Sequence, residues 1–335
     1  MNFFPIRRLK AGIEISSDKI KSAVIFKKGP TFSIEALFDV KIEPGVIKPS
    51  FMKENIIDET AFQECLKESC KDIILKNINV ALPDSCIKIL IRKFKELPKE
   101  MQDINEMVLW NISSFLDLPV GELRASWENM GKSSDNQHVF FIAFGLDKII
   151  TQYEEAFKRI GISPVIMAPS RLNQFNFYSK VLPDKGNIAY LGMFDDFLNI
   201  FVFSDGVPVF YKLIKKGFLG NDNTSAVNDV DLLIQYYNSE NPGLDIEKFF
   251  IASHIKSDLL MEHILQDITH IGSHIKSDML IEQILLDGNH IDFVIIDERQ
   301  LIEFDERFKI FFKNNPLPFY STVLGTAQGL LENSI

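Results

Sequence analysis

The chain has 335 residues, of which 46% are hydrophobic and 24% are charged. This length accommodates about two domains with a sizeable core, and the mixture excludes wholesale disorder and low complexity. The chain contains 36 Lys and Arg residues against 46 Asp and Glu residues, a net charge of -10. We therefore do not expect it to bind nucleic acid or anionic lipid non-specifically.

The cysteines and the hydropathy pattern indicate a cytoplasmic protein. Cys65, Cys70 and Cys86 are too few for a closed set of disulfides, and we expect buried structural thiols in a reducing compartment. The first residues are basic and apolar but lack the long apolar stretch of a secretory signal. The longest uncharged run, residues 314–331, is interrupted by prolines and glycines. We therefore expect no transmembrane helix.

The start of the chain predicts a meander of three antiparallel strands, because apolar and polar residues alternate between short turns. The strands cover residues 13–15, 20–26 and 32–42. A helix follows, for which Thr60 and Gln63 form a candidate capping box. A short apolar strand then ends at Pro83.

Residues 80–159 have the pattern of a small α+β unit inserted between two strands. Strands are predicted over residues 87–94 and 139–144, and helices over residues 104–116 and 148–160. After this unit come a strand over residues 164–168 and a helix that begins at Ser170.

A second meander repeats the pattern of the first. Its strands cover residues 188–194, 197–203 and 207–213, and Asp195 and Asp196 form the first turn. A helix over residues 227–237, strands over 249–252 and 293–296, and a closing helix over 322–331 follow. Two lobes that each open with a meander and continue in strand–helix alternation are the arrangement of actin-like, ribonuclease-H-type ATPases. In that fold, phosphates are held between the two hairpin turns.

Residues 253–292 contain a tandem duplication with a period of 20 residues. Ser253-His-Ile-Lys-Ser-Asp258 recurs as Ser273-His-Ile-Lys-Ser-Asp278, and each copy continues in an apolar, helix-like run, Leu259–Leu265 and Met279–Leu286. Two copies are too few for a solenoid, so we expect a local duplication within a larger fold. The duplicated histidines are a candidate metal site, and a solvated helix surface is the alternative. Five of the six histidines lie here: His254, His263, His270, His274 and His290.

Several short segments, in this order, resemble the PilM family of type IV pilus assembly proteins. PilM is similar in fold to the cell-division protein FtsA. The match extends over nearly the whole chain apart from the duplication, and it includes the helix that carries Trp110. The matching segments are residues 12–21, 80–83, 96–98, 118–119, 156–162, 203–206 and 324–329.

The resemblance implies an actin-like, two-lobe α/β fold with an inserted α+β subdomain. We expect residues 1–79 and 160–185 to form the first lobe, residues 80–159 the inserted subdomain, and residues 186–335 the second lobe. Proteins of the PilM family lie at the inner face of the cytoplasmic membrane and hold the cytoplasmic tail of the membrane protein PilN. The resemblance also makes the pilus motor ATPases, and a second copy of this chain, candidate partners. It places the groove for the tail between the inserted subdomain and the first lobe.

The resemblance also locates candidate residues for binding ATP and magnesium. Glu14, Ser16, Ser17 and Lys21 correspond to the family's first phosphate loop, in which an aspartate and a glycine stand at the positions of Glu14 and Ser16. A glutamate moves the carboxylate outward, and a serine adds a side chain where phosphate would approach closely. Weak phosphate contact through Ser17 and Lys21 remains open.

The other two nucleotide elements also depart from the family pattern. No carboxylate precedes the glycine in Tyr190-Leu-Gly-Met-Phe194, and Ser253-His254 replaces a glycine pair. We therefore expect a scaffold with degenerate nucleotide loops and no enzymatic activity. The alternative is an actin-like ATP-binding protein or slow ATPase switch in pilus or type II secretion-like assembly, for which Glu14, Asp195 and Asp196 are the candidate carboxylates.

Overall fold

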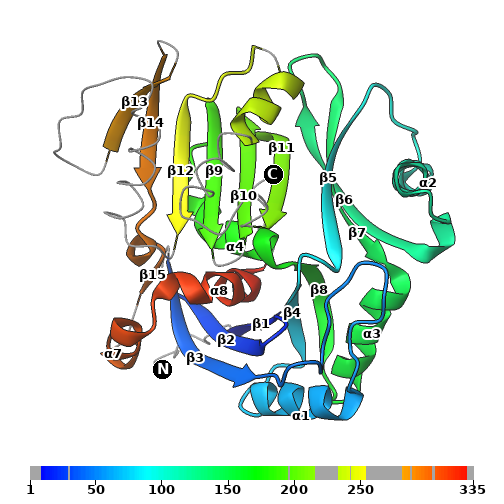
Figure 1. The fold of residues 1–335 in the computed structure, drawn as a ribbon, viewed down its shortest axis with the longest axis vertical. Helices are drawn as coiled ribbons and strands as arrows, with labels where there is room; N and C mark the ends of the chain where they lie inside the picture. Colours follow the sequence, from blue (N-terminus) through cyan, green and yellow to red (C-terminus); the bar gives the residue numbers. More distant parts are fainter. Residues whose placement is uncertain are drawn as a thin grey trace, which may run out of the picture.

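The structure is a computed structural model of the full chain. It describes residues 9–28, 31–194, 197–215, 233–241, 243–253, 281–286, 289–303 and 306–329. Figure 1 shows two large sheets, with helices between them, and a smaller sheet at one side.

The first large sheet has six strands in the order β15-β3-β2-β1-β4-β8. The meander β1-β2-β3 is antiparallel, and β4 and β8 continue the sheet in parallel from β1. The predicted meander is therefore confirmed. The strands are β1 (Leu9–Ile15), β2 (Lys19–Lys28), β3 (Thr31–Lys41), β4 (Asn77–Leu82), β8 (Ser163–Pro169) and β15 (Ile302–Glu303).

The second large sheet has the order β11-β10-β9-β12-β14-β13. It repeats the first sheet, because an antiparallel meander, β9-β10-β11, is again followed by two parallel strands, β12 and β14. The two lobes thus share one topology, as the sequence predicts. The strands are β9 (Asn187–Phe194), β10 (Phe197–Ser204), β11 (Val207–Lys215), β12 (Lys248–Ser253), β13 (Ile281–Leu286) and β14 (Asn289–Ile295).

Two helices, α4 (Ser170–Tyr178) and α8 (Ser321–Gln328), lie between the sheets (Figure 1). They cross so closely that a Cβ atom on Gly325 would lie 1.9 Å from the carbonyl oxygen of Asn173. A Cβ atom on Gly12 of β1 would lie 2.3 Å from the backbone nitrogen of Ala327. Glycine is therefore needed at both positions for close backbone packing. Side chains from both helices and both sheets form one continuous apolar cluster.

The inserted subdomain is a three-stranded antiparallel sheet, β5-β7-β6, with α2 (Met101–Leu116) packed against it. Its strands are β5 (Ile87–Phe94), β6 (Leu123–Lys132) and β7 (His138–Leu146). The sheet meets the second lobe along β11, and the rings of Phe141 on β7 and Phe201 on β10 stack with 6.2 Å between their centroids. The sequence predicts this α+β unit, but β6 is not among the predicted strands.

Helices α1 (Glu59–Cys70) and α3 (Asp147–Lys158) pack beside the first sheet. The predicted capping box of α1 is wrong. The N-cap is Asp58, whose carboxylate accepts a hydrogen bond from the backbone N–H of Ala61 at 3.0 Å. Gln63 instead donates to the carbonyl oxygen of Ala156 on α3 at 2.8 Å. Asp58 is the better cap because its short carboxylate reaches the first free N–H groups.

The duplicated segment departs from its predicted helical form in the part that the structure describes. Residues Ile281–Leu286, predicted as the end of a helix, form β13 and pair antiparallel with β14. Residues 254–280, with the other predicted helical run, lie outside the described residues, and so do His254, His263, His270 and His274. A metal site there stays a prediction.

The last elements contact the first sheet, although the sequence analysis assigns them to the second lobe. Strand β15 pairs with β3, and α8 packs against β1. Helix α7 (Glu306–Asn314) was not predicted, and it is followed by a 3-10 turn, η5 (Leu317–Tyr320). The predicted closing helix extends only to Gln328 in the structure.

Two of the three cysteines are buried, as expected, whereas the third is not. Cys70 and Cys86 are buried, Cys65 is half-buried, and all three are free thiols. Burial raises the pKa of Cys70 and of Cys86 to about 11. None of the described helices combines the length and the apolar character needed to cross a membrane.

Candidate functional site

The turn between β1 and β2 contains two of the four predicted phosphate-loop residues. The Ser16 hydroxyl donates to a carboxylate oxygen of Asp18 at 2.7 Å, and the Ser16 N–H donates to the Lys19 carbonyl at 2.9 Å. Ser16 is therefore engaged within its own turn. Ser17 is exposed at the tip.

The other two predicted residues form a buried ion pair below this turn. Glu14 on β1 and Lys21 on β2 are cross-strand partners, only 6% and 9% exposed. The Lys21 ammonium lies 3.4 Å from a carboxylate oxygen of Glu14. The tight turn fixes this register, and opposite charges directly across an antiparallel pair attract each other.

The C-terminal part of the chain completes the environment of Lys21. The ammonium donates a hydrogen bond to the backbone carbonyl of Phe319 in η5, and it lies 5.5 Å from the centre of the Tyr320 ring. Burial, with a smaller effect of Asp39, raises the pKa of the Tyr320 hydroxyl. The lysine charge is thus satisfied by a carboxylate, a carbonyl and an aromatic face of the same chain.

The second hairpin, β9-β10, contributes Tyr190, Phe194 and Phe201 to the apolar cluster between the lobes. A Cβ atom on Gly192 would lie 2.2 Å from the side-chain oxygen of Asn199. Asn199 is fully buried, and its amide group has no hydrogen-bond partner among the residues that the structure describes. Asp195 and Asp196, the candidate substitute carboxylates, lie outside the described residues. Ser253 donates to the Met193 carbonyl at 3.1 Å.

Arg171 connects this hairpin to the first lobe, and the sequence analysis did not identify it. Its backbone N–H donates to Asp84 at 2.9 Å, and its guanidinium lies 3.5 Å from the other Asp84 oxygen. The guanidinium also lies about 6 Å from the rings of Phe194 and Phe197, at 6.0 and 5.9 Å. Burial raises the pKa of Asp84, although the charge of Arg171 opposes that shift. The only sequence signal for this contact is the presence of charged residues, Asp84 and Arg171, beside otherwise apolar strands.

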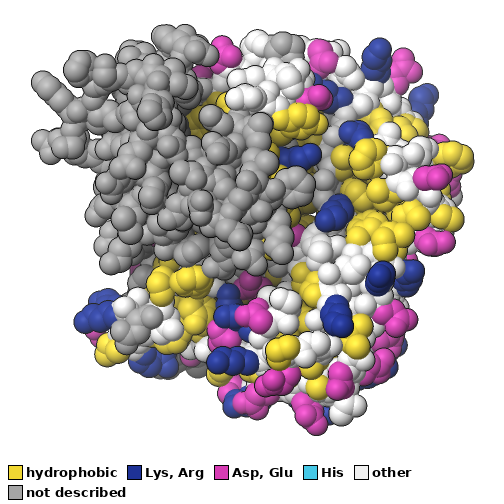
Figure 2. All heavy atoms as spheres, in the orientation of Figure 1, with side chains coloured by type: hydrophobic (Ala, Val, Ile, Leu, Met, Phe, Trp, Pro, Cys, Tyr) yellow, Lys and Arg dark blue, Asp and Glu magenta, His cyan; other side chains and the backbone are white. Residues whose placement is uncertain are grey.

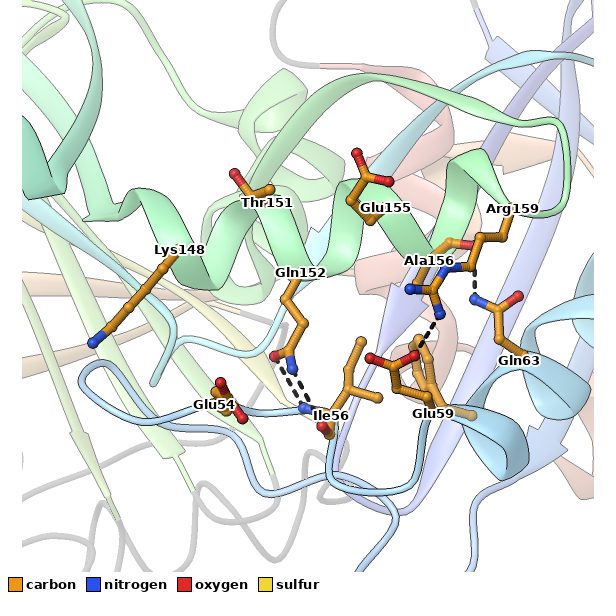
Figure 3. Close-up of a pocket in the computed structure, with 11 residues that line it drawn as sticks. Glu54, Ile56, Glu59, Gln63, Lys148, Thr151, Gln152, Glu155, Ala156 and Arg159 are labelled. Carbon is orange, nitrogen blue, oxygen red and sulfur yellow. Dashed lines mark hydrogen bonds and ion pairs between the residues drawn. The ribbon is translucent and has the colours of Figure 1, made fainter.

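A separate pocket lies between α1 and α3, the two helices that pack beside the first sheet (Figure 3). Its volume is about 300 Å³, and it is enclosed by α1, the segment before α1, and α3. Ile56, Phe62 and Ala156 are its buried apolar residues, and charged side chains surround them. The remaining lining residues are Glu54, Glu59, Gln63, Lys148, Thr151, Gln152, Glu155 and Arg159.

Polar contacts hold the two walls of this pocket together. The Gln152 side chain accepts from the N–H groups of Asn55 and Ile56 at 2.9 and 3.1 Å, and it donates to the Ile56 carbonyl at 3.2 Å. Arg159 pairs with Glu59 at 2.5 Å, and this hydrogen bond raises the pKa of the guanidinium. Figure 3 shows both contacts crossing from α3 to the opposite wall. These contacts fix the two walls of the pocket relative to each other.

Comparisons with known proteins agree with this architecture. No family model and no curated protein sequence matches the chain. The structure is similar to a PilM-PilN type IV pilus biogenesis complex, with a TM-score of 0.70, 13% identity, and coverage of 96% of this chain and 98% of that one.

Two further solved structures are similar at a lower level. One is the cytoplasmic domain of EpsL, an inner-membrane component of the type II secretion system of Vibrio cholerae (TM-score 0.46, 11% identity, 81% of this chain and 99% of that one). The other is a protein with an actin-like ATPase fold from Bacteroides thetaiotaomicron (TM-score 0.47, 10% identity, 97% and 98%). The likeness to the PilM-PilN complex and the two repeated sheets show that the chain has the actin-like fold with an inserted subdomain, and that it shares this fold with PilM, as the sequence resemblance implies.

Proposed function

We propose that this chain is an actin-like scaffold of type IV pilus assembly that binds the cytoplasmic tail of a PilN-like membrane protein. The observation that carries the proposal is the likeness in fold to the PilM-PilN complex, which extends over 96% of the chain and includes the inserted subdomain. In this role the chain acts at the inner face of the cytoplasmic membrane and is held there by its partner. The pilus motor ATPases are further proposed partners.

The pocket between α1 and α3 is the proposed site for the tail. It lies between α1 and α3, the helix that directly follows strand β7 of the inserted subdomain. Its apolar floor of Ile56, Phe62 and Ala156 suits alternate side chains of an extended peptide. The ion pair of Glu59 with Arg159 and the contacts of Gln152 keep the walls at a fixed separation. A site that is already formed lowers the entropic cost of binding a flexible tail.

Calorimetric titration with a synthetic peptide tests this role. The peptide copies the amino-terminal cytoplasmic tail of the PilN-like protein encoded beside this chain, and we expect saturable binding. Gln63→Trp places a large ring in the pocket and should abolish binding, whereas Glu64→Trp, on an exposed part of the same helix, should not. If the wild-type chain does not bind the tail, the proposed function is wrong. If Gln63→Trp binds as well as the wild type and remains folded by circular dichroism, only the location is wrong.

We further propose that nucleotide does not regulate the scaffold. Glu14 and Lys21 neutralise each other, and Lys21 also donates to the Phe319 carbonyl, so these residues fit a hydrated magnesium ion and a triphosphate poorly. Ser16, which stands where the family has glycine, is engaged within its turn. We therefore derive no catalytic step for this site.

Thermal unfolding with and without MgATP tests this part of the proposal. A ligand present at about 100 times its dissociation constant would add about 2.7 kcal/mol to the free energy of unfolding, so binding would be visible. We expect no measurable shift of the midpoint. A shift of many degrees that Lys21→Ala or Ser17→Ala removes would favour the alternative, an ATP-binding switch.

A further inference from the structure

A second pocket lies at the carboxyl end of α8, and it shares no residue with the pocket between α1 and α3. Its volume is about 460 Å³, within the range of about 300–1,000 Å³ that is usual for small-ligand sites. The first residues of β1 and β4, Ile166 on β8, and the two residues Gln328 and Gly329 at the end of α8 contribute to its lining. Figure 1 shows α8 beside these strands of the first sheet.

Side chains of the sheet hold the end of α8 at this pocket. The Lys10 ammonium donates to the Gln328 carbonyl at 3.2 Å, and the Asn79 amide donates to the Thr326 carbonyl at 3.2 Å. Both accept the role of partners for carbonyl groups that a helix leaves unpaired at its carboxyl end, and the lysine charge complements the helix dipole. Gly329 has a φ of +88°, and a Cβ atom there would lie 3.3 Å from the Asn79 amide nitrogen. The end of α8 is therefore fixed relative to the sheet.

The side chain of Gln328 is the unusual feature of this pocket. The residue is only 5% exposed, and neither its side-chain oxygen nor its side-chain nitrogen has a hydrogen-bond partner among the described residues. Most buried polar groups are paired, because an unpaired one destabilises the fold. An unpaired amide offers an acceptor oxygen and two N–H donors to a group that enters the pocket. This side chain therefore points to a ligand that supplies both a donor and an acceptor.

The charged residues that line the pocket are all positive. They are Lys10 and Lys76, and none of the described lining residues is acidic, in a chain whose net charge is -10. Lys10 is already engaged with α8, whereas Lys76 is exposed. In Figure 2, acidic and basic side chains are interspersed over the lower part of the molecule. An anion would therefore be attracted by these individual lysines and not by a broad basic surface.

Two further features narrow the class of ligand. None of the described lining residues is aromatic, so the pocket has no ring on which a nucleobase could stack. A carboxylate ion alone would pair with a lysine, but it has no N–H group for the Gln328 side-chain oxygen. A peptide group supplies an N–H and a carbonyl, and a chain terminus adds the carboxylate. Leu75 and Ile166 in the lining favour aliphatic side chains on that peptide.

We propose that this pocket binds the carboxyl-terminal residues of an extended peptide. The Gln328 amide accepts from one peptide N–H and donates to a peptide carbonyl, and Lys76 pairs with the terminal carboxylate. Leu75 and Ile166 contact aliphatic side chains. The partner is thus a protein that ends in aliphatic residues. This contact uses other residues, and the other end of a polypeptide, than the tail-binding site proposed between α1 and α3, so the two proposals can fail separately.

Fluorescence anisotropy of the full chain with dye-labelled tripeptides tests the proposal. The peptides end in valine, leucine or isoleucine, carry the dye at their amino end, and are made both as free acids and as carboxamides. We expect saturable binding of the acids, and about three- to fivefold weaker binding of the carboxamides. Lys76→Gln should remove this difference, and so should high salt, because the exposed charge is screened. Lys67→Gln, on an exposed part of α1, is the matched control and should not change it.

Gln328→Met separates a ligand-binding role of this side chain from a structural one. The substitution keeps the size of the side chain and removes its unpaired polar atoms, so the midpoint of thermal unfolding of the free chain should stay the same or rise. Affinity for the free-acid peptides should nevertheless fall about tenfold, because two hydrogen bonds are lost. Gln102→Met, at an exposed position of α2, is the control for the substitution and should bind like the wild type.

Three outcomes would overturn the proposal. The first is that none of these peptides binds the wild-type chain. The second is that acids and carboxamides bind equally well, which would exclude recognition of a carboxyl terminus. The third is that Gln328→Met binds as tightly as the wild type. If Gln63→Trp abolishes binding in that case, the peptides occupy the pocket between α1 and α3 instead.

Discussion

Replacing Lys21 with methionine should strongly destabilise the first lobe. The substitution preserves most of the side-chain volume but leaves the Glu14 carboxylate, 6% exposed, without its counter-charge. Removal of one partner of a buried ion pair costs about 3–5 kcal/mol, because the remaining charge stays desolvated. The lost hydrogen bond to the Phe319 carbonyl adds to this cost. We therefore expect the free energy of unfolding to fall by about 4 kcal/mol.

A double-mutant cycle separates the ion pair from the other contacts of Lys21. Glu14→Gln with Lys21→Met removes both charges, and the double variant should be more stable than Lys21→Met alone. Urea unfolding followed by circular dichroism gives the four free energies. The coupling energy should be about 2 kcal/mol or more, since the two groups are buried and close. Additivity within about 0.5 kcal/mol would refute the view that these charges depend on each other.

Three further substitutions test individual contacts by urea unfolding. Gly12→Ala places a Cβ atom 2.3 Å from the backbone of Ala327, and the forced separation of β1 and α8 should cost about 3 kcal/mol. Gln152→Leu removes three hydrogen bonds to the segment at Ile56 and should cost about 2–3 kcal/mol. Because burial raises the pKa of Cys86 from 9.0 to about 11, the unfolded thiol ionises first, and stability should fall as pH rises through that interval. Cys86→Ala should reduce this slope by up to about 1.4 kcal/mol per pH unit.

The sequence predicts the repeated strands well and the irregular parts poorly. Alternation of apolar and polar residues is a direct consequence of one buried sheet face, so both meanders can be recognised. Strand β6 was not identified because its residues, Leu123–Lys132, are largely polar and only half-buried. Strand β13 was read as helix because Ile281, Ile284 and Leu285 fall at helical spacing, and pairing with β14 overrides that local pattern.

In the candidate site, only contacts between neighbouring strands of one hairpin could be predicted from the sequence. A tight turn at Ser16–Lys19 places Glu14 opposite Lys21, which follows from counting residues. The Phe319 carbonyl cannot be found in this way, because it is a backbone group 298 residues away in sequence. Gln152 presents the same difficulty, since its partners are backbone groups of a distant loop. A backbone group can form such a hydrogen bond whatever side chain its residue carries, so the sequence gives no signal of the contact.

The contacts across the lobes are those expected of a rigid scaffold. In a nucleotide-driven switch, the ligand supplies the charge that holds two lobes together, and its loss lets them separate. Here, Arg171 joins Asp84 to the Phe194 ring of the second hairpin, so a side chain of the chain itself supplies that link. Lys21, in turn, is held by Glu14 and by the Phe319 carbonyl beside the first sheet. A partner that binds outside this cleft then meets a surface whose geometry does not depend on a bound nucleotide. Arg171→Leu, which removes this link between the lobes, should therefore increase amide hydrogen exchange in β9 and β10 more than in the inserted sheet.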